Sequence, residues 1–272
     1  MNILGIGKIG SAIAEKFKTY PQYKVFKAHS DANISNGEFY LEDKTRPEEY
    51  ETTSIITNFD IDSELDVFIC GEEIASAATL NILEQYKECT IRIFYIKPNS
   101  KFLSETQKLT DKVVYNVLQE YTRSKRFDSM YILDYDQLMK TIGKVPITQV
   151  KDKLYSTISS TIHMINFLDN NEPVMSNFQD MPVTYCINTI GLMDFQKGEE
   201  SKFFPLDNVR EKRYYYCINE NQLNNDGELF DLISNQIDTK LEENTTTTFG
   251  VYPTKYDTNY CYVVYKSPYI QK

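Results

Sequence analysis

Three glycines near the N-terminus have the spacing of a phosphate-binding turn. Gly5, Gly7 and Gly10 form the pattern G-x-G-x-x-G between a short apolar run and a segment with helical spacing. Glycine lets the backbone turn tightly and approach a phosphate, which the N-terminus of the following helix attracts. Ser11 opens that segment, and Asp31 follows Gly10 at a distance that suits contact with a ribose. These five residues are therefore candidate nucleotide-binding residues.

The sequence contains few residues that favour other kinds of catalysis. The chain has only two histidines, His29 and His163, and the second lies within a predicted helix beside core positions. The five cysteines are scattered without a C-x-x-C pair, which predicts buried thiols in a reducing compartment. We therefore expect no metal site.

The charge balance and hydropathy limit the classes of partner. With 39 acidic and 29 basic residues among 272, the formal net charge is −10, which argues against nucleic acid as a partner. No stretch approaches the roughly 20 apolar residues of a membrane span, and the N-terminus lacks a basic region followed by a hydrophobic signal segment. The sequence therefore predicts a cytoplasmic protein without a membrane partner.

Strand-like and helix-like segments alternate through the first half of the chain. The expected strands cover residues 2–4, 23–28, 65–71, 90–96 and 130–133, and the expected helices cover 11–20, 72–86 and 103–122. Residues 37–51 are polar and aperiodic, which predicts a loop with short extended pieces. Repeated strand-then-helix order predicts an α/β domain with a mostly parallel sheet at residues 1–144.

The second half has a different organisation. Apolar residues recur every three or four positions from Ile147 to Ile165, which predicts a long helix within a linking segment at 145–168. The expected strands that follow cover 183–192, 214–218, 246–251 and 260–265, with one amphipathic helix at 229–241. We therefore expect a smaller α+β domain with an antiparallel sheet at 169–272.

This order of elements resembles the FtsZ/tubulin superfamily, and the motifs are closest to FtsZ. Lys97-Pro98 and the segment YDQLMKTIG at 135–143 follow that family's order, in which the corresponding stretch of FtsZ reads IPNDKLLKVLG. Similarly, VFKAHSDAN at 25–33 resembles FIAINTDAQ, and PVMSNFQDM at 173–181 resembles GLMNVDFADV. The resemblance implies an FtsZ/tubulin-like fold with a nucleotide-binding-type sheet, a long central helix and a smaller domain.

The resemblance also implies that the GTP site is degenerate. The superfamily's second phosphate loop reads GGGTGSG, whereas CGEEIASAA at 70–78 keeps Gly71 and places Glu72 and Glu73 beside it. Two unit charges about 4 Å apart interact by about 4 kcal/mol near a protein surface, so these carboxylates oppose phosphate binding. In the first helical turn they satisfy the amides and the dipole that otherwise attract phosphate. We therefore expect weak or absent GTP and GDP binding, and Mg²⁺ only if GTP binds.

The remaining nucleotide and catalytic positions of the family are also altered. By the resemblance, Phe102 replaces the acid that contacts the ribose, unless Glu105 takes its place, and Tyr135 replaces an asparagine that contacts guanine. The loop that acts on the neighbouring subunit's nucleotide carries Asn177 and Asp180 where two acids are usual. Asn177 and Asp180 are thus the candidate catalytic residues, and the alternative is an ordinary polar turn.

The sequence leaves three separable hypotheses for function, and it does not distinguish the first from a purely structural particle component with the same fold. The first is an FtsZ/tubulin-like protein that assembles with itself or with a related polymer through longitudinal faces and has a degenerate GTP site. The second is an active filament-forming GTPase with an altered phosphate loop. The third is a dinucleotide-binding oxidoreductase, for which the sequence offers no convincing group for hydride transfer. The altered loops argue against catalysis, and any retained activity would be that of a GTPase.

Overall fold

A computed structural model describes residues 1–32, 37–51 and 55–272 of the chain. It divides into two compact units, unit 1 at Met1–Ser160 and unit 2 at Thr161–Lys272. The division falls inside the long helix α6 (Val150–Asp169), whereas the sequence interpretation kept this helix apart as a linker.

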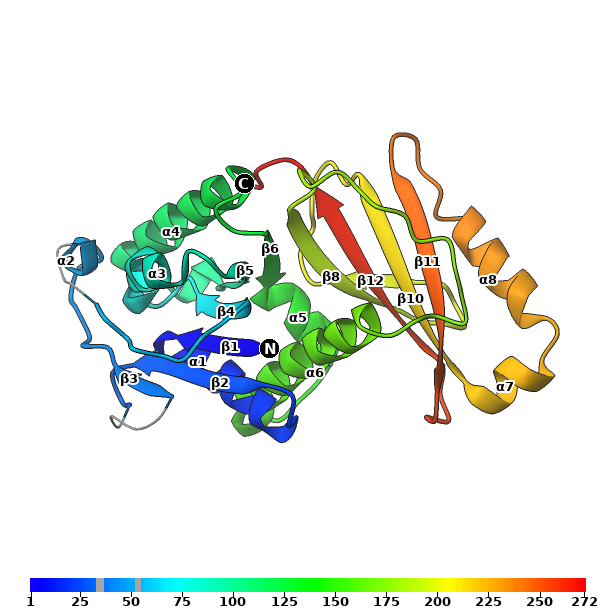
Figure 1. The fold of residues 1–272 in the computed structure, drawn as a ribbon, viewed down its shortest axis with the longest axis horizontal. Coiled ribbons are helices and arrows are strands. Elements are labelled where there is room, and N and C mark those ends of the chain that lie inside the picture. The colour runs from blue at the N-terminus through cyan, green and yellow to red at the C-terminus, as the bar shows by residue number, and fades with distance from the viewer. Residues whose placement is uncertain (33–36, 52–54) are drawn as a thin grey trace. The chain divides into compact units, whose positions relative to one another are not determined.

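Unit 1 is built on a parallel sheet, as the alternation of strands and helices predicts. Its strand order is β3-β2-β1-β4-β5-β6 (Figure 1), and every pair of neighbours is parallel. The strands are β1 (Asn2–Ile6), β2 (Lys24–His29), β3 (Glu38–Tyr40), β4 (Glu64–Cys70), β5 (Thr90–Lys97) and β6 (Ser129–Asp134). The central strands β1 and β4 are buried along nearly their whole length, which explains their continuous apolar sequences.

The helices of unit 1 follow the strands in order. They are α1 (Gly7–Lys16), α2 (Glu48–Glu51), α3 (Thr79–Leu83), α4 (Glu105–Arg123) and α5 (Tyr135–Ile142), followed by the first half of α6. α1 packs on β1, β2 and β4, and α4 packs on β6. A capping box defines the start of α4, because the Ser104 hydroxyl accepts from the Gln107 amide while the Gln107 side chain accepts from the Ser104 amide.

Two segments of unit 1 differ from the sequence prediction. The helix expected at 72–86 is divided into a 3₁₀ segment η2 (Ile74–Ala78), α3 and a second 3₁₀ segment η3 (Glu84–Tyr86). Thr79 donates its hydroxyl hydrogen to the Ser76 carbonyl, a side-chain contact that competes with regular helical bonding. The segment expected as a loop at 37–51 contains β3, in line with short extended pieces, but also the helical turn α2.

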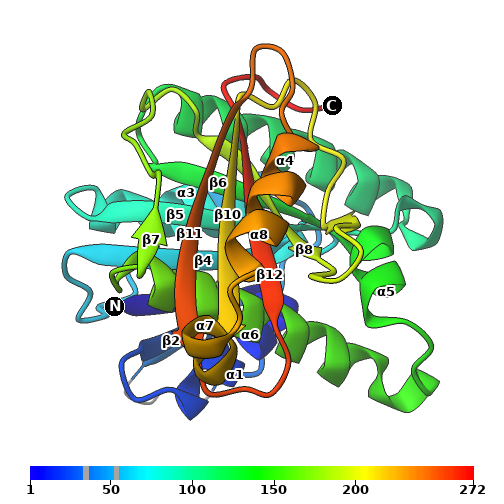
Figure 2. The same ribbon diagram turned by 90° about the vertical axis from the view of Figure 1, so that its right-hand side faces the viewer.

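Unit 2 carries a mixed sheet covered on one face by a helix. Its order is β8-β12-β10-β11-β7, with β9 beside β8. The strands are β7 (Met175–Ser176), β8 (Ile187–Met193), β9 (Glu200–Lys202), β10 (Glu211–Asn219), β11 (Thr246–Thr254) and β12 (Tyr260–Ser267). The helices are α7 (Glu220–Asn225) and α8 (Leu229–Asp238), and α8 lies along this sheet (Figure 2).

Most strands of unit 2 pair antiparallel, as expected, and one pair is parallel. β8, β12 and β10 pair antiparallel, as do β11 and β7, but β10 and β11 are parallel from Glu211 opposite Thr246 onward. A parallel pair needs a crossover connection, and α7 and α8 lie within the connection here. The amphipathic helix predicted at 229–241 therefore has the topological role of crossing between these strands.

The five cysteines are free thiols, as expected from their spacing. Four of them are buried and Cys89 is half-buried. In the ranges that the structure describes, no helix is long and apolar enough to cross a membrane.

The glycine turn of unit 1 leads to a stability prediction. A Cβ at Gly10 would lie within 3 Å of the Phe68 carbonyl oxygen in β4, where the backbone cannot easily move. We expect Gly10→Ala to destabilise the protein by about 1–3 kcal/mol through overpacking, measured by urea unfolding. The control is Gly227→Ala, because a Cβ at Gly227 meets no atom within 4 Å. Equal stability of the two variants would contradict the assigned packing role.

Candidate functional site

The candidate site lies at the carboxyl ends of the adjacent parallel strands β1 and β4. Ile6 of β1 is paired in register with Ile69 of β4, so the glycine turn after β1 and the loop after β4 emerge at the same edge of the sheet. This is the edge at which ligands bind in open α/β sheets. Both loops that the sequence singles out are therefore adjacent in space.

The first glycine motif forms a tight strand-to-helix turn. Gly7 has φ +78°, a conformation that favours glycine, and α1 begins at this residue. At Gly5 and Gly10 any Cβ would collide with backbone atoms, so these two positions let α1 pack closely on β1 and β4. Ser11 is buried and donates its hydroxyl hydrogen to the Gly5 carbonyl at 3.1 Å. The motif thus fixes the packing of α1 and exposes the amides of its first turn.

The Glu73 carboxylate occupies the N-terminus of α1. Its two oxygens accept hydrogen bonds from the backbone amides of Lys8, at 2.6 Å, and Ile9, at 3.0 Å. A Cβ at Gly7 would lie 2.5 Å from a Glu73 oxygen, so only glycine leaves room for this contact. α1 has no acidic residue in its first turn and no side-chain cap from Ile6. Glu73 therefore provides the negative charge that the helix dipole favours there.

This geometry corrects one part of the sequence interpretation. The sequence predicts that the carboxylates of Glu72 and Glu73 both accept hydrogen bonds from the amides of the helix that follows them. Glu73 does stand at the N-cap of η2, but its side chain makes no cap bond there and reaches the amides of α1 instead. Glu72 makes no such contact and lines a neighbouring pocket. The expected intramolecular carboxylate is present, but it fills the anion site of the other loop.

The protonation of Glu73 is set by two opposing effects. Burial raises the pKa of Glu73 to about 7, although the amide hydrogen bonds of Ile9 and Lys8 lower it. Burial likewise raises the pKa of Glu72, and the Lys151 charge opposes that rise. Near neutral pH, Glu73 therefore exchanges between its ionised and its neutral form.

The other two candidate binding residues have partners within the protein. Asp31 forms an exposed ion pair with Lys8 at 3.2 Å, and this contact raises the pKa of Lys8. Asn33, the last residue of the segment that resembles FIAINTDAQ, lies outside the described residues. The Gly71 amide donates to the Ile96 carbonyl at 3.1 Å, and a Cβ there would collide with the side chains of Asp111 and Tyr95. Gly71 thus serves the packing of β4 against β5.

A pocket of about 200 Å³ lies beside the Glu73 contact. It brings together Phe102 and Tyr135, the two residues that the resemblance places at ribose and base positions, whereas Glu105 is not among its lining residues. Residues that sequence reasoning missed complete it, namely Asn99, Lys151 and Tyr155. No local pattern marks Lys151 and Tyr155, because they come from α6, far along the chain, whereas Asn99 directly follows Lys97-Pro98.

The two candidate catalytic residues belong to unit 2. Asn177 extends the pairing of β7 with β11, because its side-chain oxygen accepts from the Phe249 amide at 2.7 Å and its own amide donates to the Phe249 carbonyl at 3.1 Å. Asp180 is exposed in the following loop. Asn177 therefore has a structural role in this unit, and Asp180 is accessible to a neighbouring molecule.

Comparison with known proteins identifies the fold of this chain. No protein-family model and no curated protein sequence matches the chain. Among solved structures, a GTPγS-form protofilament of TubZ from Bacillus thuringiensis serovar israelensis superposes with a TM-score of 0.74 over 97% of this chain and 86% of that one, at 13% identity. The chain has the FtsZ/tubulin fold.

Two further structures show the same FtsZ/tubulin fold. An empty FtsZ dimer from M. jannaschii gives a TM-score of 0.67 at 9% identity, over 98% of this chain and 87% of that one. A TubZ of type III plasmid segregation gives 0.70 at 14% identity, over 97% and 86%. The fold implied by the sequence resemblance is therefore confirmed over nearly the whole chain.

The candidate site in unit 1 combines the Glu73 contact with the neighbouring pocket. In the described parts of the chain, no cluster of three or more His, Cys, Asp or Glu side chains is arranged to hold a metal ion. What the geometry provides is a helix N-terminus closed by a carboxylate and a pocket with two tyrosines and a lysine at its side.

Glu73 makes folding stability depend on pH. Its pKa rises from an ordinary 4.5 to about 7 in the folded protein, so the native state holds the proton more tightly than the unfolded chain. The contribution of this proton to the free energy of unfolding is complete below about pH 4.5 and is lost as pH rises through about 7. It amounts to about 3 kcal/mol at most. We expect Glu73→Gln to remove this loss when urea unfolding is compared between pH 5 and 8.

The control for this comparison is Glu88→Gln, which changes an exposed carboxylate on the same unit. It should keep the pH dependence of the unchanged protein. If Glu73→Gln keeps it as well, Glu73 does not titrate in this interval.

Proposed function

We propose that this protein is a tubulin-like assembly protein whose phosphate site is closed by its own Glu73, so that it binds GTP and GDP weakly or not at all. The observation that carries the proposal is the pair of hydrogen bonds from the Lys8 and Ile9 amides to the Glu73 carboxylate. The proposed partner is a second copy or a related FtsZ/tubulin-like polymer, bound through longitudinal faces.

The closed site opposes nucleotide for two reasons. A phosphate at the N-terminus of α1 must displace the Glu73 carboxylate. The free energy that the phosphate gains there must therefore outweigh that of the two charge-assisted hydrogen bonds that the carboxylate already accepts. The displaced carboxylate then stays nearby, and a like charge about 4 Å away costs about 4 kcal/mol, or roughly a thousandfold in affinity. Protonation of Glu73 weakens this second effect at lower pH.

The assembly part of the proposal rests on the fold. The TubZ structures similar to this chain are described as protofilaments and as two-stranded and four-stranded filaments. Phe102 of unit 1 lines the 200 Å³ pocket and is 84% exposed. Another subunit can cover this large apolar side chain. An assembly without nucleotide exchange needs no open phosphate site.

Nucleotide titration tests the closed site. We expect the unchanged protein to give no saturable heat with micromolar GTP, GDP or NADH, with or without Mg²⁺. Glu73→Ala frees the Lys8 and Ile9 amides, and we expect it to bind GTP at least about tenfold more tightly than the unchanged protein. Glu88→Ala, which removes the same charge at an exposed position, should behave like the unchanged protein.

The other outcomes separate the alternatives. Micromolar GTP binding by the unchanged protein, with an increase in light scattering, would establish an active filament GTPase. Asp180→Ala would then test the proposed role of Asp180 in hydrolysis on a neighbouring subunit, where bound GTP would also bring Mg²⁺. Binding of NADH would favour the dinucleotide alternative.

Sedimentation velocity tests assembly independently of nucleotide. We expect the sedimentation coefficient to rise with protein concentration in the absence of GTP, and Phe102→Ser to weaken this association several-fold. Tyr40→Ser, which removes an exposed aromatic on β3, should leave it unchanged. A monomer at every concentration, in a protein that also fails to bind nucleotide, would contradict self-assembly and leave a related polymer as the partner.

A further inference from the structure

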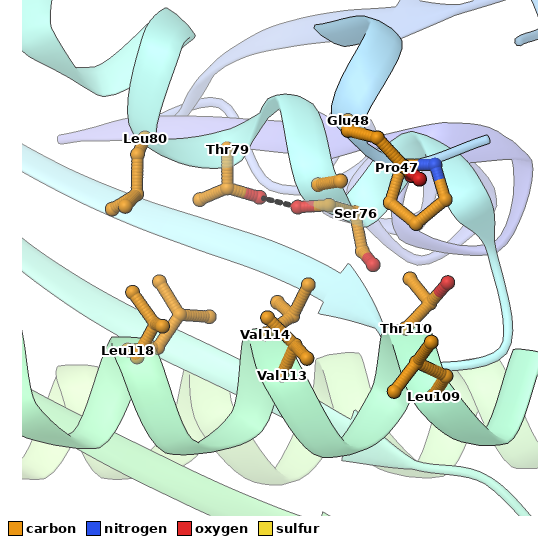
Figure 3. Close-up of a pocket in the computed structure, with 12 residues that line it drawn as sticks. Pro47, Glu48, Ser76, Thr79, Leu80, Leu109, Thr110, Val113, Val114 and Leu118 are labelled. Carbon is orange, nitrogen blue, oxygen red and sulfur yellow. Dashed lines mark hydrogen bonds between the residues drawn. The ribbon is translucent and has the colours of Figure 1, made fainter. Parts of the chain in front are cut away.

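A second pocket of unit 1 lies away from the Glu73 site, between the segment after β4 and helix α4. Its volume is about 290 Å³. Pro47 and Glu48 close one end (Figure 3). One face of α4 forms one long side, and the other consists of Ser76, Ala77, Thr79 and Leu80. The α4 residues that line it are Leu109, Thr110, Val113, Val114, Val117 and Leu118.

Most of the lining is aliphatic, and one polar group among the described lining residues is unsatisfied. The Ser76 side chain is 1% exposed, and its hydroxyl oxygen has no hydrogen-bond partner among the described residues. Figure 3 shows this hydroxyl pointing toward the α4 side chains. A buried hydroxyl without a partner is destabilising, so its position in an open pocket is a cue for a ligand that completes the bond.

The neighbouring polar groups do not meet this need. Thr110 donates its hydroxyl hydrogen to the Thr106 carbonyl within α4, and the Thr79 hydroxyl donates to the Ser76 carbonyl rather than to its side chain. Among the described residues that line this pocket, Glu48 alone is ionisable, and it stands at the end of the groove. Its carboxylate disfavours an anionic ligand.

Leu109 and Val113 show that the groove is open to solvent at its rim. Their side chains are 59% and 50% exposed, whereas Val114 and Leu118 deeper in the pocket are buried. An apolar cavity of about 150 Å³ already holds a benzene molecule, so this one has room for roughly ten non-hydrogen atoms. The dimensions suit a small molecule better than a partner helix.

We propose that this groove binds a small, uncharged, mainly apolar molecule that carries one hydroxyl-type hydrogen-bonding group, which pairs with Ser76 Oγ. The aliphatic walls receive the apolar body, and Ser76 supplies the polar contact at depth. This site is separate from the closed phosphate site and does not depend on whether nucleotide binds there.

Three probes of matched shape test the proposal on the full chain. They are 3-phenylpropan-1-ol, propylbenzene, which lacks the hydroxyl, and 3-phenylpropionate, which is charged. In methyl NMR spectra we expect 3-phenylpropan-1-ol to shift the signals of Leu80, Val113, Val114 and Leu118 saturably, and 3-phenylpropionate to bind at least about tenfold more weakly. Shifts confined to other regions, or none at all, would overturn the site.

Ser76→Ala tests the polar contact directly. We expect this substitution to weaken the binding of 3-phenylpropan-1-ol about fivefold, the usual effect of one hydrogen bond, and to leave the binding of propylbenzene unchanged. Equal binding of the alcohol to both proteins would overturn the role of Ser76. Because this comparison uses the same two proteins for both probes, it does not depend on equal stability of the variant.

A pair of phenylalanine substitutions on α4 tests the location. Val117→Phe should fill the groove and abolish binding of all probes, whereas Asn116→Phe, at an exposed neighbouring position outside the lining, should leave binding intact. Undiminished binding to folded Val117→Phe would overturn the site. Broadening of the groove signals with protein concentration alone would show that a second copy covers it, and would overturn the small-molecule proposal.

Discussion

The contact of the Glu73 carboxylate with the first turn of α1 organises the edge of the sheet in unit 1. Helix α1 starts without an acidic residue or a side-chain cap of its own, and its first amides need an acceptor. Glu73 supplies one from the loop after the neighbouring strand. Gly7 has to lack a side chain for this contact to form, and Gly5 and Gly10 have to be small for α1 to lie close enough to the sheet.

Two side chains beside Gly71 explain why this position is a glycine. The Tyr95 hydroxyl donates to the Asp111 carboxylate at 2.7 Å, and this pair fills the space beside Gly71. Lys97 lies 3.9 Å from the same carboxylate and over the ring of Tyr115. A side chain at position 71 would collide with this network, so the packing of the fold requires the glycine whether or not a phosphate binds nearby.

Unit 2 contains one carboxylate that is hydrogen-bonded within the fold, Glu200, and another that is exposed to solvent, Asp180. Glu200 accepts hydrogen bonds from the hydroxyls of Tyr214 and Tyr265, and these bonds lower its pKa against the effect of burial. Its hydrogen-bonding capacity is used within the fold. Asp180 is exposed, which is the property that a residue acting on another subunit requires. The two acids thus differ in burial, since Glu200 is bonded within the fold and Asp180 is exposed to solvent.

The sequence by itself determined most of the longer strands and helices, the parallel sheet of unit 1, the FtsZ/tubulin-like fold and the presence of carboxylates in the second loop. Those conclusions rest on local periodicity and on motifs within short segments, which act through neighbouring residues. Only the tertiary structure decided that Glu73 meets amides 64 and 65 positions away, that β10 and β11 run parallel, and that Ser76 faces an apolar groove against α4. These features depend on which strands and helices pack side by side, and no short-range pattern encodes the position of a side chain relative to a distant segment.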